Sequence, residues 1–126
     1  MVIENVGLRT KNSVLFDCQE FVNLFHRFPK AGALLDVGHA HVNGWDLAAT
    51  VCALKEHLVA CHIHDNDGNG DAHLPVGQGN VDWYAYFEAV KQYAPNAVQV
   101  MEYSCGFADT ASLKIHLEEL KKKYAL

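Results

Sequence analysis

The fold is decided by Ala33-Leu34-Leu35-Asp36, a short apolar run that ends in a carboxylate and is followed by Gly38. A segment of helical length comes next, with Leu47, Val51 and Leu54 on one face. A short apolar run before an amphipathic segment predicts a buried strand and a helix that packs against it. This strand-and-helix unit is short enough to recur within 126 residues.

The same unit is written four times along the chain. Similar apolar runs cover residues 2–5, 58–64 and 97–102, and the pattern predicts helices over roughly 17–28, 46–57, 82–93 and 110–124. Asp17 and Asp46 stand where the side chain of an N-cap is needed. Strands that alternate with helices indicate an α/β fold with a parallel sheet, whose strands all end at one edge. We expect one domain over residues 1–126.

Each apolar run ends in a side chain that binds metal ions in proteins. These residues are Glu4, Asp36, His62 or His64, and Glu102. Because side chains alternate between the faces of a strand, each of them continues an apolar row, which faces the interior of a closed barrel. We therefore expect them to converge at the C-terminal ends of the strands. This mixed oxygen and nitrogen set suits Mn, Mg, Zn or Co, and it leaves both histidines as candidates.

Other polar residues lie close to these runs in the sequence. His39 follows the second run, and Asp71 and His73 lie in a loop that extends from Asp65 to Asn80. A loop of this length in a compact domain is usually functional. The alternative is an acidic turn with a solvent-exposed histidine and no function. Asp65 directly follows a histidine pair, so we expect its carboxylate to bond one of those rings and fix its tautomer.

The composition excludes several classes of function. A net charge of −5 argues against nucleic acid as a partner. No apolar run reaches the roughly 18 residues of a membrane span, and no signal peptide is visible at the N-terminus. The four cysteines form no C-x-x-C pair, which indicates reduced thiols and a cytoplasmic protein.

The order of these motifs resembles the xylose isomerase-like barrel superfamily, which includes sugar phosphate isomerases, epimerases and endonuclease IV. The matching segments are Ile3-Glu4-Asn5, Asp36-Val37-Gly38-His39-Ala40, His62-Ile63-His64-Asp65-Asn66, Asp71 to Trp83, and Met101-Glu102. The resemblance implies the C-terminal half of a (β/α)8 TIM barrel, with four of its eight βα units.

The resemblance also implies a metal-dependent isomerase or epimerase. Glu4, Asp36, one histidine and Glu102 would bind a divalent metal ion. The two glutamates would act as an acid/base pair on opposite faces of a sugar or sugar phosphate, with an enediolate between the two proton transfers. The endonuclease-like pattern favours His62 as the ligand, and the ketose epimerase pattern favours His64.

Two other functions follow from the same resemblance. In the endonuclease branch, His39, Asp71 and His73 would bind a further zinc ion of a multinuclear phosphodiesterase, which also uses histidines from the first half of the barrel. In the sugar enzymes, His39 would instead contact a substrate oxygen. The third function is that of a metal-binding fragment without catalysis.

The half-barrel pattern bears on partners as well as on activity. Because a full barrel has about 250 residues, we expect a fragment, a chain that pairs with an N-terminal half-barrel, or a homo-oligomer. Activity of the chain alone is in doubt, because substrate-binding residues of four strands are absent.

Overall fold

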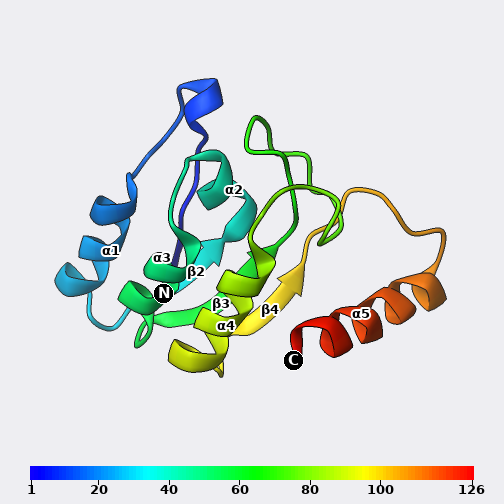
Figure 1. Ribbon diagram of the computed structural model, residues 1–126. Helices are drawn as coiled ribbons and strands as arrows, with labels where there is room; N and C mark the ends of the chain where they lie inside the picture. Colours follow the sequence, from blue (N-terminus) through cyan, green and yellow to red (C-terminus); the bar gives the residue numbers. More distant parts are fainter.

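The computed structural model describes residues 1–126 as one parallel sheet with helices packed on one face (Figure 1). The strands lie in the order β1 (Val2–Glu4), β2 (Gly32–Asp36), β3 (Leu58–Ile63) and β4 (Val98–Met101). All neighbours pair in parallel. The helices are α1 (Cys18–Arg27), α2 (Val37–Val42), α3 (Leu47–Leu54), α4 (Trp83–Tyr93) and α5 (Thr110–Tyr124), and Arg9–Lys11 form a 3-10 turn. The predicted α/β half-barrel is confirmed.

The helices begin where the sequence supplies a cap. The Asp17 carboxylate accepts a hydrogen bond from the Glu20 N–H, and the Glu20 side chain returns one to the Asp17 N–H. Asp46, Asp82 and Asp109 cap α3, α4 and α5 by accepting a hydrogen bond from the N–H three residues on, and of these only Asp109 makes a reciprocal bond, from its N–H to the Ser112 side chain. A side chain that satisfies a free N–H of the first turn fixes the start of a helix.

The helix α2, like the 3-10 turn, is an element that the sequence pattern did not predict. The Asp36 carboxylate accepts a 2.8 Å hydrogen bond from the His39 N–H and starts six helical residues. A segment this short carries fewer than two helical turns, so its apolar residues show no periodicity.

The two faces of the sheet differ in their exposure. Leu35 and Cys61 are fully buried under α1, α3 and α4. On the other face Val2, Val98 and Val100 are 56%, 61% and 39% exposed. This open face corresponds to the interior of a complete barrel, where such side chains pack against those of the other strands.

The long loop after β3 is held by one buried carboxylate, that of Asp65. Its Oδ1 accepts hydrogen bonds from the Asn66 N–H at 2.9 Å and the Val81 N–H at 3.2 Å. Its Oδ2 accepts from the Gly77 N–H and the Trp83 Nε1–H, both at 2.8 Å. The prediction that Asp65 bonds a histidine ring is therefore wrong, because its oxygens are taken by N–H groups of the loop and of α4.

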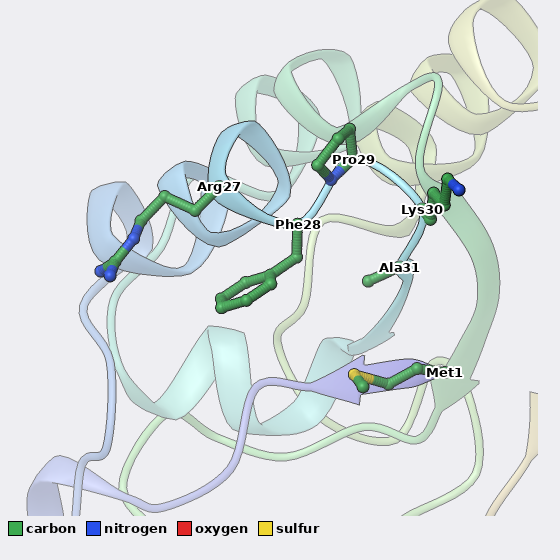
Figure 2. Close-up of a pocket in the computed structure, with 6 residues that line it drawn as sticks. All are labelled: Met1, Arg27, Phe28, Pro29, Lys30 and Ala31. Carbon is green, nitrogen blue, oxygen red and sulfur yellow. The ribbon is translucent and has the colours of Figure 1, made fainter.

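A hollow of about 420 Å3 lies at the N-terminal ends of the strands (Figure 2). Its walls are Met1, which precedes β1, and residues 27–31, which run from the end of α1 to the start of β2. It contains no carboxylate or histidine and lies at the opposite end of the strands from the candidate ligands. None of the helices combines the length and the apolar character needed to cross a membrane.

Candidate metal centre

Three carboxylates surround one imidazole nitrogen at the C-terminal edge of the sheet. The Nδ1 atom of His62 lies 3.5 Å from Glu4 Oε1, 3.8 Å from Asp36 Oδ2 and 3.4 Å from Glu102 Oε2. Each of these residues ends its strand or lies within one residue of that end. The structure thus brings together four of the five residues that the sequence nominates, one from each βα unit.

Strand pairing accounts for this convergence. Asp36 and His62 are direct partners across β2 and β3, and the Glu102 N–H bonds the carbonyl of Ile63 at 3.2 Å. The side chain of Asp36 is 1% exposed, whereas those of Glu4, His62 and Glu102 are 20% to 38% exposed. Asp36 is therefore the buried member of the cluster, and Glu4, His62 and Glu102 form its solvent-accessible side.

The donor set fits a divalent cation. No lysine or arginine forms an ion pair with any of the three carboxylates, whose ion-pair partners are all histidines. Neighbouring ligands on an ion with bonds of about 2.1 Å lie roughly 3.0–3.4 Å apart, close to the separations around His62. Buried or half-buried carboxylates repel one another unless a cation lies among them. Ligand atoms of Asp36, His62 and Glu102 lie close enough to share an ion, and so do those of Glu4, Asp36 and His39. Asp36, His62 and Glu102 would hold that cation, with Glu4 beside them.

A second cluster is formed by His39, Asp71 and His73. The Nε2 atoms of both histidines lie 3.2 Å from the same oxygen, Asp71 Oδ2. Their Nδ1 atoms lie 3.2 Å from the Asn5 carbonyl and 2.7 Å from the Glu102 carbonyl. A carbonyl oxygen only accepts, so each Nδ1 carries the proton, and a neutral ring presents a lone pair at Nε2. Two lone pairs and a carboxylate oxygen that meet in this way fit a cation between them.

Two further observations mark this second cluster. The other oxygen of Asp71, Oδ1, is buried without a hydrogen-bond partner, which is rare for a carboxylate in a folded protein. His73 has a φ of 48°, a strained conformation for a residue with a side chain. Ser104 fixes this conformation by donating its N–H to the His73 carbonyl at 3.0 Å. The structure holds His73 in place at an energetic cost, as is common at functional sites.

His64 lies apart from the open cluster, behind Asp36. Its Nε2 atom is 3.1 Å from Asp36 Oδ1 and 3.3 Å from Oδ2, and the side chain is fully buried. Its ring stacks on that of His73 with 3.8 Å between centroids. Ligand atoms of His64, His73 and Glu102 also lie close enough to share an ion. His62 and His64 share a face of β3 in sequence terms, so the sequence did not distinguish them as ligands. The structure does: His62 lies in the open cluster and His64 behind Asp36.

The electrostatics of the two clusters favour positive charge. Burial raises the pKa of Asp36, but the hydrogen bond and charge of His64 and the His39 N–H together bring it below 3.8. Burial lowers the pKa of His73, but its bond to the Glu102 carbonyl and the charge of Asp71 bring it above 6.5. Asp36 is therefore ionised at neutral pH, and Asp71 attracts a proton or a metal ion to Nε2 of His73.

The sheet with polar side chains at the ends of its strands defines a class of protein, the parallel α/β barrels with a site at the C-terminal edge. Within that class, the sequence profile of the family described as xylose isomerase-like TIM barrel matches residues 1–123. The chain belongs to this family, as its motifs had predicted.

Individual relatives agree with this assignment. The chain is 32% identical over 101 residues to the uncharacterized protein MJ1311 of Methanocaldococcus jannaschii, covering 75% of this chain and 34% of that protein. It is 29% identical over 87 residues to the uncharacterized protein MJ1614 of the same organism, covering 68% and 33%. The crystal structure of a D-tagatose 3-epimerase-like protein superposes with a TM-score of 0.68 and 26% identity, over 95% of this chain and 47% of that one. The chain spans about a third of these curated relatives.

Proposed function

We propose that the chain carries the metal site and the acid/base pair of a divalent-metal-dependent isomerase or epimerase that acts on a sugar or sugar phosphate. One observation carries the proposal. Glu4 ends β1 and Glu102 directly follows β4, the two outer strands, yet their carboxylates approach the same His62 nitrogen, to 3.5 and 3.4 Å. Two carboxylates that flank one small site suit proton removal on one side of a substrate and proton return on the other. The fold shared with a D-tagatose 3-epimerase-like protein supports this choice.

The buried and the exposed residues of the site have different roles in this proposal. The fully buried Asp36 and the imidazole of His62 orient the site, while the side chains of Glu4 and Glu102 are 32% and 38% exposed. A bound divalent cation supplies Lewis-acid polarisation of a carbonyl and its neighbouring hydroxyl. One glutamate removes the proton beside the carbonyl, which gives an enediolate, and the other glutamate returns a proton. His39, whose Nε2 atom lies 3.2 Å from Asp71 Oδ2, would contact a substrate oxygen.

Metal content tests this proposal directly. We expect about one equivalent of Mn, Co, Zn or Mg per chain by elemental analysis after loading and desalting, and its loss in Glu4→Gln/Glu102→Gln. The matched control is Glu88→Gln, because Glu88 is an exposed carboxylate on α4 that pairs with Lys91. Exchange of solvent deuterium into ketoses is then measured with the metal-loaded protein. A wild-type chain that retains no metal would contradict the proposal.

The second cluster favours a second candidate, a phosphodiesterase with more than one metal ion. The observation behind it is the meeting of two imidazole lone pairs and Asp71 Oδ2 at 3.2 Å. Adjacent metal ions stabilise both the attacking and the leaving oxygen of a phosphate ester. Two equivalents of metal, of which Asp71→Asn removes one, together with hydrolysis of bis(4-nitrophenyl) phosphate, would favour this function over isomerisation.

We further propose that the open face of the sheet is covered in the working protein by more βα units. The exposed valines of that face and the unpaired outer edges of β1 and β4 support this. A second copy of the chain or an N-terminal half-barrel would supply them, together with further substrate-binding residues.

A further inference from the structure

His64 is buried against a carboxylate of the proposed metal site rather than within that site. Its Nε2 lies 3.1 Å from Asp36 Oδ1, and the same oxygen accepts a 2.8 Å hydrogen bond from the His39 N–H. Oδ2 is the oxygen that faces Nδ1 of His62, at 3.8 Å. The His64 Nε2 atom is also 3.3 Å from Oδ2, but it lies nearer to Oδ1, where the His39 N–H binds too. Two donors therefore meet at Oδ1, and Oδ2 is left facing the cluster.

The direction of the bond between His64 and Asp36 follows from the charge of the carboxylate. An ionised carboxylate has no proton to give, so the proton between the two groups is on Nε2 of His64. The Nδ1 atom of a neutral ring then has none. This agrees with its lack of any hydrogen-bond partner, although it lies 3.6 Å from Asp71 Oδ1.

The ring of His64 is clamped from two sides. A Cβ atom added to Gly38 of α2 would come within 2.0 Å of its Cε1 atom and 2.3 Å of its Nδ1 atom. On another side the ring lies against that of His73, with only 8° between the ring planes. The glycine of the Asp36-Val37-Gly38-His39 motif is thus required by the close approach of an imidazole, and the ring has little freedom to turn.

We propose that His64 is a positioning residue for the metal site: it holds the Asp36 carboxylate so that Oδ2 faces the ion, and Gly38 makes room for it. This deepens the proposed function and rests on the metal site described there. Partners of ligating groups fix ligand orientation, and their loss typically lowers metal affinity by about 10–100-fold. The role requires an N–H donor at Nε2 and a ring kept in place.

The experiment compares two substitutions of the same residue by titration with Co2+ alone. His64→Phe keeps a ring of similar size but has no donor, and we expect its affinity to fall by about 10–100-fold. His64→Gln keeps an N–H near the position of Nε2, and we expect it to stay within about 5-fold of wild type. The d–d absorption of bound Co2+ reports the change in coordination without any assay of activity. His57→Phe is the control, because the half-buried His57 stacks on Phe25 just before β3 begins, whereas His62 lies near the other end of that strand.

Gly38→Ala provides a second test that removes no polar group. The added methyl displaces the ring of His64, so we expect a similar loss of Co2+ affinity in a chain whose circular dichroism matches that of wild type. Equal affinity in all variants would overturn the positioning role while leaving the metal site intact. Equal losses in His64→Phe and His64→Gln would overturn it too, since packing alone would then explain them. A wild-type chain that binds no Co2+ would overturn the proposed function and this inference together.

Discussion

At the scale of single residues, Asp36 combines a role in the fold with a place in the candidate metal site. Its Oδ1 starts α2 by accepting the His39 N–H, and its Oδ2 faces the cluster around His62. The sequence predicts a metal ligand at this position, and the structure adds the N-cap of α2. Because a carboxylate has two oxygens with separate lone pairs, the two roles are compatible.

Asp65 carries the first prediction. Asp65→Asn replaces one of two acceptor oxygens with an NH2 group that faces N–H donors, so two of four hydrogen bonds are lost and two donors are left buried. Each unsatisfied donor costs about 1–3 kcal/mol, so we expect unfolding in urea to be easier by about 3 kcal/mol. Trp83→Phe is the control, since it removes a single donor and keeps most of the ring in the core. A change below about 0.5 kcal/mol in Asp65→Asn would show that this carboxylate does not hold the loop.

At the scale of elements, the sequence predicts the helices well where a cap and an apolar stripe coincide. The expected range of 110–124 is the observed α5, and α1 differs from its expected range by one residue at each end. The predicted 46–57 overruns α3, which ends at Leu54 because the chain must turn into β3 at Leu58. The 3-10 turn and α2 escaped prediction because segments this short have no period to read.

The cap of α1 carries the second prediction. Asp17→Ala removes the acceptor of the Glu20 N–H and breaks the reciprocal capping box, so we expect a loss of about 1 kcal/mol in thermal or urea unfolding. Asp17→Asn keeps an acceptor oxygen and should lose less than half as much. Metal content should not change in either variant, because α1 contributes no residue to the two clusters. Equal stability of the alanine variant and wild type would contradict the assigned role of the cap.

The start of α5 carries a prediction on pH. The Ser112 N–H and hydroxyl hold the pKa of Asp109 below 3.8. A carboxyl group whose pKa is lowered by folding stabilises the helix above its unfolded pKa, and this contribution is lost as pH falls through the folded value. We expect the amide NMR shifts of residues 110–113 to titrate below pH 3.8. In Asp109→Asn this titration should vanish, while its persistence there would assign it to another group.

The sequence predicts which residues meet at the candidate site but not how His62, His64 and Asp65 are placed around it. Strand period and the common edge of a parallel sheet predict that Glu4, Asp36, His62 and Glu102 meet. The separate places of His62 and His64 depend on where β3 ends and on the room beside Gly38, which are properties of packing. The same holds for Asp65, whose four partners come from three separate positions along the loop and from α4.

At the scale of the whole molecule, one face of the sheet is covered by helices and the other is exposed to solvent. The helices bury Leu35 and Cys61 completely, whereas valines of the other face are left in contact with solvent. The outer edges of β1 and β4 have backbone groups without strand partners. Apolar side chains beside unpaired strand edges favour association with another β-structure.

The last prediction concerns this open face. We expect sedimentation velocity to show concentration-dependent association of the wild-type chain, and Val98→Lys to weaken it by at least 10-fold. Lysine places a charge beside the edge of β4, which opposes pairing, while the 61% exposure of Val98 keeps the stability of the fold within about 0.5 kcal/mol. The control is Ile115→Lys, because Ile115 is 62% exposed but lies on α5, away from the sheet. If both variants associate alike, the valine face is not the contact. If the wild-type chain stays monomeric at every concentration, a different set of βα units must cover the face, and an added N-terminal half-barrel is then the partner to test.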